Sequence, residues 1–185
     1  MQVAELVPPA SAADLTALAE ITCACVAEGA NIGWLAGLDI ATATAWWRGL
    51  LAEPGLRCLV ARDDDGTVVG TVSLRLDQPS NARHRADVTK LLVHPSARRS
   101  GIATDLMAAA ERLAVAEHRV VLLLDTETGS AAETFYRGEG WVEYGRLARH
   151  AARPDGLLTG STFFAKEIET PYRESPDFFM GSSSP

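Results

Sequence analysis

The hydrophobic period of the chain changes near Gly101, and this change constrains the fold more than any other feature. Residues 86–93 are predicted to form a strand that ends before Pro95, because the residue before a proline is held in extended geometry. After Gly101, apolar side chains recur at helical spacing to about residue 118, and residues 120–124 form an apolar run typical of a buried strand. The segment therefore predicts a β-α-β crossover.

Caps and turns mark the remaining elements. Ser11 and Asp14 resemble a capping box that opens a first helix, and Asp39 can cap a second one. Ser130 with Glu133 forms another capping box before a short helix. Further strands are predicted over residues 57–61 and 68–76, which form a hairpin, and over residues 141–147 and 160–168.

Length and composition fit a single domain that acts on small solutes. We expect one domain over residues 1–169 of the 185 and a flexible tail over residues 170–185. The formal net charge of −7 argues against nucleic acid as a partner, because phosphate binding needs a clustered cationic surface. Residues 1–9 lack the cationic start of a signal peptide, and no 18-residue apolar run occurs. We therefore expect a cytoplasmic protein with no membrane partner.

The cysteines favour neither a disulfide framework nor a metal site. Cys23, Cys25 and Cys58 form an odd set, and the first two point away from each other on a predicted helix. The four histidines are scattered rather than placed at ligand spacing. We expect buried thiols and no bound metal.

A candidate anion site lies where the crossover helix begins. A helix N-terminus offers unpaired backbone N–H groups and the positive end of the helix dipole. Gly101 and Ala103 are small enough for a pyrophosphate to approach the main chain, and Arg98 and Arg99 add positive charge.

This loop resembles the coenzyme A loop of the GNAT superfamily of N-acetyltransferases, written R/Q-x-x-G-x-G/A and matched here by Arg98, Gly101 and Ala103. The family order of elements also matches: a strand before the loop, a strand after the helix, and then Phe135-Tyr136. A closer likeness, to the tabtoxin resistance protein group of small-molecule acetyltransferases, extends over about residues 25–168. It is carried by residues 29–34, 38–39, 85–88, 96–98, 124–127, 129–130, 132–136 and 154–156.

The resemblance implies an α/β (α+β) GNAT fold that binds acetyl-CoA. A mixed central sheet of about six to seven strands would splay between its fourth and fifth strands, with helices on both faces. The fourth strand would pair with the pantetheine, and the loop backbone would wrap the pyrophosphate. At a position where the family often has an asparagine, this chain has Gly129. Ser130 is therefore the nearest residue whose side chain could contact the cofactor. The implied cofactor-binding residues are Leu91, Leu92, Val93, Arg98, Arg99, Ser100, Gly101, Ile102, Ala103, Thr104, Ser130 and Tyr136.

Acetyl transfer to an amine needs a proton acceptor for the nucleophile and an acid for the departing thiolate. Tyr136 matches the family tyrosine that protonates the thiolate. Asp125 ends an apolar strand at the expected splay, where partial burial would suit it to act as the base. Asp87 on the preceding strand is the rival base, and Glu127 is a third option.

The acceptor is predicted to be the primary amine of a small amino-acid-like or antibiotic molecule, in self-protection or biosynthesis. Asn31, Trp34 and Asp39, in the early segment that the superfamily at large does not share, are the candidate acceptor-binding residues. Acetylation of a protein or peptide amine and a catalytically silent acetyl-CoA-binding module are the alternatives. The chain is expected to be a monomer or a homodimer.

Overall fold

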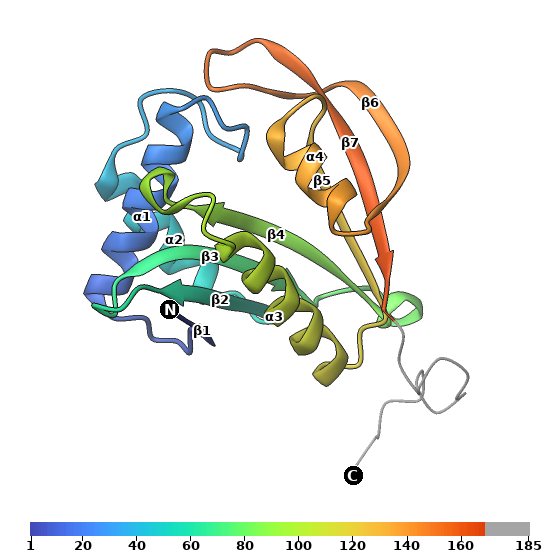
Figure 1. Ribbon diagram of the computed structural model, residues 1–185, viewed down its shortest axis with the longest axis horizontal. Coiled ribbons are helices and arrows are strands. Elements are labelled where there is room, and N and C mark those ends of the chain that lie inside the picture. Colours follow the sequence, from blue (N-terminus) through green and yellow to red (C-terminus); the bar gives the residue numbers. More distant parts are fainter. Residues whose placement is uncertain (169–185) are drawn as a thin grey trace.

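The structure, a computed structural model, describes residues 1–168 and consists of a seven-stranded sheet with four helices (Figure 1). The expected tail at residues 170–185 lies outside the described residues. The strands are β1 Gln2–Glu5, β2 Leu56–Arg62, β3 Val68–Arg75, β4 Arg85–Val93, β5 Val121–Glu127, β6 Val142–Ala152 and β7 Leu158–Glu167. The helices are α1 Ala12–Ala27, α2 Ile40–Leu51, α3 Ile102–Ala116 and α4 Ala131–Gly138.

The sheet order is β1-β2-β3-β4-β5-β7-β6, and every neighbouring pair is antiparallel except β4 and β5. The parallel pair spans only three positions, from Arg85 opposite Val121 to Asp87 opposite Leu123. Beyond that point the two strands diverge, as Figure 1 shows. The predicted mixed sheet with a splay between its fourth and fifth strands is therefore confirmed.

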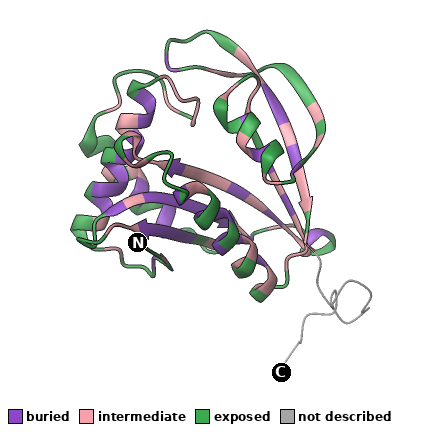
Figure 2. Cartoon of the chain, viewed as in Figure 1, coloured by how far each residue is buried: buried purple, intermediate pink, exposed green. Residues whose placement is uncertain are grey.

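Helices cover both faces of the sheet, as predicted. Helices α1 and α2 pack on one face and α3 on the other, and buried residues concentrate between these layers (Figure 2). One core cluster centres on Leu106 and Met107 of α3, and the other on Leu18 and Ile21 of α1. Alternate residues of β2 join opposite clusters, because successive side chains of a strand point to opposite faces.

The predicted caps are present. The Ser11 hydroxyl accepts a hydrogen bond from the N–H of Asp14, and the Asp39 carboxylate accepts one from Thr42. The hairpin of β2 and β3 closes where expected, with the Asp63 N–H donating to the carbonyl of Thr67. Local side-chain chemistry thus sets where α1 and α2 begin.

Strand β1 was not predicted. It has four residues, three of them exposed, so it lacks the alternation of buried and exposed side chains that marks a longer strand. It forms because the edge of β2 offers unpaired backbone groups, and Gln2 pairs with Arg62 at one end of a four-residue ladder.

A buried hydrogen bond ties α2 to α1. The indole Nε1–H of Trp47, a side chain with no exposed surface, donates to the Thr22 hydroxyl at 2.8 Å. That hydroxyl in turn donates to the carbonyl of Leu18 at 2.8 Å. The indole is therefore satisfied only because Thr22 faces α2.

Replacing Thr22 by valine should lower the free energy of unfolding by about 1–3 kcal/mol, because the buried Trp47 N–H loses its acceptor. Urea denaturation would measure the change. Thr16→Val is the matched control, since Thr16 makes the same bond to the residue four positions earlier, Ala12, but is exposed. Equal losses for the two variants would contradict the assigned role of Thr22.

Candidate active site

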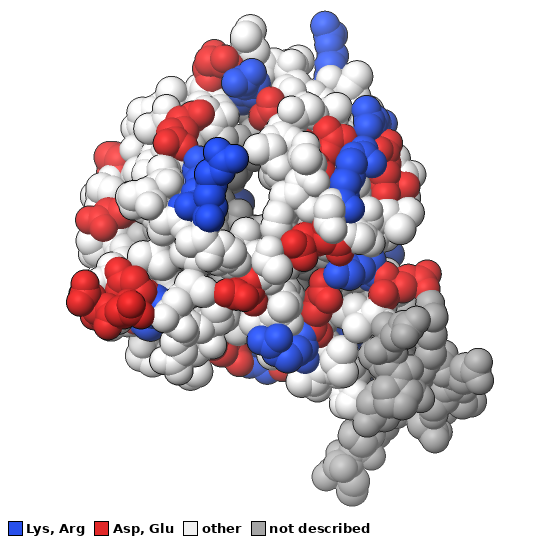
Figure 3. Space-filling view, viewed as in Figure 1, with Lys and Arg blue, Asp and Glu red and all other residues white. Residues whose placement is uncertain are grey.

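A cleft of about 1380 Å³ opens where β4 and β5 diverge. Its walls come from β4, the loop before α3, β5, α4, the end of β6 and the loop after α1. In the space-filling view it appears as a hollow between the two halves of the molecule (Figure 3). Its volume exceeds the ~300–1000 Å³ of a typical small-ligand pocket, so it has room for two bound molecules.

The candidate anion site forms one end of the cleft. Gly101 caps α3 in the left-handed region, with φ of 83°, and no side chain caps the helix. The N–H groups of Ile102, Ala103 and Thr104 have no acceptor within residues 1–168. These donors, with the helix dipole behind them, favour a bound anion.

The two arginines of this loop have different roles. Arg99 is exposed and adopts a left-handed φ of 62°, which is uncommon for a residue with a side chain. Arg98 instead turns back to α1, where its Nη1 bonds Glu28 Oε2 at 2.5 Å and its Nε donates to the carbonyl of Val93. Arg98 therefore holds the loop against the end of α1 and the end of β4, and Glu28 already pairs with its charge.

The open edge of β4 forms the long wall. Past Asp87 the strand has no partner on the β5 side, and residues 88–93 line the cleft. An unpaired strand edge presents N–H and C=O groups that an extended chain with amides can join, as in strand addition. Among the predicted cofactor-binding residues, all but Ser100 line the cleft; the Ser100 hydroxyl donates to the carbonyl of Ala97 at 2.6 Å.

Tyr136 lines the cleft from α4. Its ring packs against Phe135, Trp141 and Phe164. Burial raises the pKa of the Tyr136 hydroxyl well above its usual value, and the nearby negative charge of Asp125 raises it further. The hydroxyl therefore stays protonated at neutral pH, as a proton donor requires.

Asp125 also lines the cleft, from β5, but its surroundings differ from those predicted. Its side chain is 47% exposed rather than partly buried, because β4 has already diverged from β5 at this level. His150 Nε2 lies 3.8 Å from Asp125 Oδ2, and the imidazole packs edge-on against Phe163. Sequence reasoning missed His150, which lies where the β6 register is irregular, between Leu147 and Ala151.

Asp87 does not line the cleft. It lies in the three-residue stretch where β4 and β5 still pair, and its carboxylate accepts a hydrogen bond from Gln78 at 2.9 Å. Glu127, the third predicted option, lines the cleft and lies 3.7 Å from Arg153. The geometry brings Asp125, and not Asp87, together with Tyr136.

Of the three residues predicted to bind the acceptor amine, one lines the cleft and two do not. Asn31 lines the cleft. Trp34 does not; it packs edge-on against Trp46 at 5.7 Å. Asp39 is exposed and caps α2. The loop that carries them is anchored across the cleft mouth, because the Ala36 N–H donates to the carbonyl of Pro154 at 2.9 Å.

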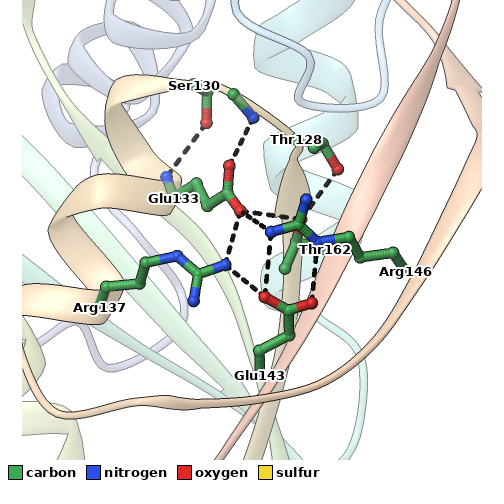
Figure 4. Close-up of polar contacts among 8 residues, drawn as sticks. Thr128, Ser130, Glu133, Arg137, Glu143, Arg146 and Thr162 are labelled. Carbon is green, nitrogen blue, oxygen red and sulfur yellow. Dashed lines mark hydrogen bonds and ion pairs between the residues drawn. The ribbon is translucent and has the colours of Figure 1, made fainter.

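A charged network holds α4 against β6 and β7 (Figure 4). The buried Glu133 accepts hydrogen bonds from the Gly129 N–H, Arg137, Arg146 and the Thr162 hydroxyl. The Ser130 hydroxyl caps the helix at the N–H of Glu133, as predicted. Since Tyr136 lies one turn further along α4, this network fixes the position of the tyrosine.

The comparisons with known proteins agree with this geometry. Residues 19–141 match the model of the acetyltransferase (GNAT) family, and the chain belongs to that family. Ribosomal-protein-alanine N-acetyltransferase from Brucella melitensis is 27% identical, with a TM-score of 0.74 over 91% of this chain and 100% of that one. A putative acetyltransferase from Salmonella typhimurium, with its cofactor acetyl-CoA, is 20% identical, with a TM-score of 0.74 over 95% and 97%. An aminoglycoside 6'-acetyltransferase type Ii is 17% identical, with a TM-score of 0.71 over 92% and 99%.

Acetyl-CoA is the acetyl donor of this family, and the cleft fits it. The free N–H groups at α3 suit its pyrophosphate, and the open β4 edge suits the two amides of its pantetheine. Its thioester supplies an activated acetyl group. The likeness to the tabtoxin resistance group stays a prediction.

Within residues 1–168, no group of His, Cys, Asp and Glu side chains could hold a metal ion, and no helix is long and apolar enough to cross a membrane. All three cysteines lie in this part of the chain and are free; Cys25 and Cys58 are buried and Cys23 is partly buried.

The α4 network should make stability depend on acid pH. Hydrogen bonds from Arg146 and Arg137 lower the pKa of Glu143 from 4.5 to about 2, and Arg137 with the Gly129 N–H lowers that of Glu133. A lowered folded-state pKa stabilises the protein above the unfolded value, and this contribution is lost as the pH falls from 4.5 towards 2.

Thermal unfolding of the wild type and Glu143→Gln across this range would test the network. The variant should melt at a lower temperature near neutral pH and should lose less on acidification. Parallel melting curves for the two proteins would show that Glu143 contributes nothing.

Proposed function

We propose that this protein transfers the acetyl group of acetyl-CoA to the primary amine of a small amino-acid-like or antibiotic molecule. The observation that supports this most is the pair formed by protonated Tyr136 and ionisable Asp125 in one cleft, beside the open edge of β4. A module that only binds acetyl-CoA has no need of an acid and a base together. Free cysteines agree with a reducing compartment such as the cytoplasm.

Each residue has a distinct task in this proposal. Asp125 accepts the proton of the acceptor amine, either directly or through the neighbouring His150. Tyr136 holds a proton at its hydroxyl and donates it to the departing sulfur. The walls contributed by β4 and by the loop at residues 29–39 position the two reactants, which converts a bimolecular encounter into reaction within one site.

The likeness to the tabtoxin resistance group over residues 29–39 supports a small acceptor rather than a protein. The same loop is joined to the turn after β6 by the hydrogen bond from Ala36 to Pro154, so it connects the two sides of the cleft. Short peptides belong in the acceptor panel, because acetylation of a peptide amine is the competing activity.

Tyr136→Phe should reduce kcat by about 10²–10⁴-fold, because the donor of the thiolate proton is lost. Binding of acetyl-CoA should stay close to that of the wild type, since the ring and its packing remain. Release of the coenzyme A thiol measures turnover, and calorimetric titration measures binding. An unchanged kcat would exclude Tyr136 as the acid.

Asp125→Asn should reduce kcat/KM at neutral pH and recover part of the rate at alkaline pH, where the acceptor amine deprotonates in solution. Asp87→Asn is the matched control and should behave as the wild type, because Asp87 lies outside the cleft lining. A loss confined to Asp87→Asn would assign the base to Asp87 instead.

A further inference from the structure

Lys90 is a half-buried cation in the cleft, and no counter-ion lies beside it within residues 1–168. The chain has two lysines, Lys90 and Lys166. Lys166 pairs with Glu111 at 2.5 Å. Lys90 has no carboxylate oxygen within 4.0 Å in residues 1–168, and its one hydrogen bond goes to the carbonyl of Ile32 at 3.0 Å. An ammonium has three donors, so two of them remain available.

The surroundings of Lys90 disfavour an unpaired charge. Its Nζ lies 5.2 Å from the ring centroid of Trp46 and beside Gly33, which belongs to the loop at residues 29–39. Burial lowers the pKa of Lys90, the positive charge of Arg75 lowers it further, and only Asp125 acts in the opposite direction. A bound anion would offset the free-energy cost of burying the Lys90 ammonium without an opposite charge.

The backbone at Lys90 supports a directed role. Lys90 has a φ of 54°, which is rare for a residue with a side chain. It lies in a bulge of β4, since the register with β3 shifts between the pairs Thr71 with Leu92 and Ser73 with Thr89. Bulges re-aim side chains beside active sites, and a strained residue persists where the surrounding structure holds it.

Opposite charges therefore lie in one cleft, away from the candidate anion site at the start of α3. Lys90 contributes a cation from β4, while Asp125 contributes an anion from β5. Among the other ionisable side chains in this part of the lining, Glu127 Oε1 and Arg153 Nε lie 3.7 Å apart, and His150 lies 3.8 Å from Asp125. A ligand with an ammonium and an anionic group complements Asp125 and Lys90 together.

We propose that Lys90 binds a carboxylate carried by the acceptor, so that the acceptor is an amine and an acid in one small molecule. This inference rests on the proposed acetyl transfer and narrows its acceptor class. Lys90 then orients the amine towards Asp125, and amines of the same size that lack a carboxylate bind more weakly.

Acetyl transfer to amino acids and to their carboxamides tests the proposal. The paired compounds share a side chain and differ in the carboxylate, whose charge also raises the pKa of the amine, so kcat/KM is compared on the concentration of free amine. Thiol release reports both reactions. The wild type should favour the acids by about 10-fold or more in kcat/KM. Lys90→Met should raise the KM for the acids by about 10- to 100-fold and remove that preference, with rates for the carboxamides retained.

Two further variants separate recognition from folding. Lys90→Arg should keep most of the preference, because the charge remains. Lys166→Met should behave as the wild type, since Lys166 is paired outside the cleft. Acetyl-CoA affinity, measured by calorimetry, should be the same for every variant.

Other outcomes would overturn the proposal. Equal wild-type rates on acids and carboxamides would remove the carboxylate from the acceptor. Equal losses on both series in Lys90→Met would give Lys90 a structural role in holding the loop through Ile32. Turnover only of amines that carry no carboxylate would reject this inference and leave the proposed function standing. Acetyl-CoA binding without turnover of any amine would reject both.

Discussion

Hydrogen bonding between β4 and β5 stops after three residue pairs, and the candidate site depends on that interruption. If the parallel ladder continued, the β4 edge would be satisfied by β5 and no cleft would separate them. Because the strands diverge, residues 88–93 keep a free edge, and Asp125 faces open space rather than the core. The chain leaves backbone groups unpaired within its own sheet, which is favourable only where a ligand or water can pair with them.

The two halves on either side of the divergence share one apolar cluster, which runs from α3 and β3 to Tyr136 and Phe164, and they differ in their polar contacts. On the β1–β4 side, α3 begins with N–H groups that no side chain caps, and they lie at the cleft. On the other side, α4 is held to β6 and β7 by the charged network around Glu133. The loop at residues 29–39 joins the halves at the cleft mouth through its bond to Pro154.

Much of the site could be predicted because it is local in sequence. The loop at residues 98–104 and the start of α3 form one continuous stretch, so a glycine, a helix start and small residues are enough to indicate an anion site. The helix caps at Ser11, Asp39 and Ser130 are equally local, since each acts within three residues. Tyr136 could be placed only through its resemblance to a family motif.

The sequence by itself determined the order of the elements after β1, the crossover and the glycine-containing loop at residues 98–104, because period, capping and turn chemistry act over a few residues. The tertiary structure decided which side chains meet. Strand β7 lies between β5 and β6, and an irregular register in β6 carries His150 towards Asp125. A bulge in β4 gives Lys90 its left-handed backbone, and the divergence of β4 and β5 separates Asp87 from the cleft. Such register shifts depend on pairing between distant segments, so no local pattern of residues records them.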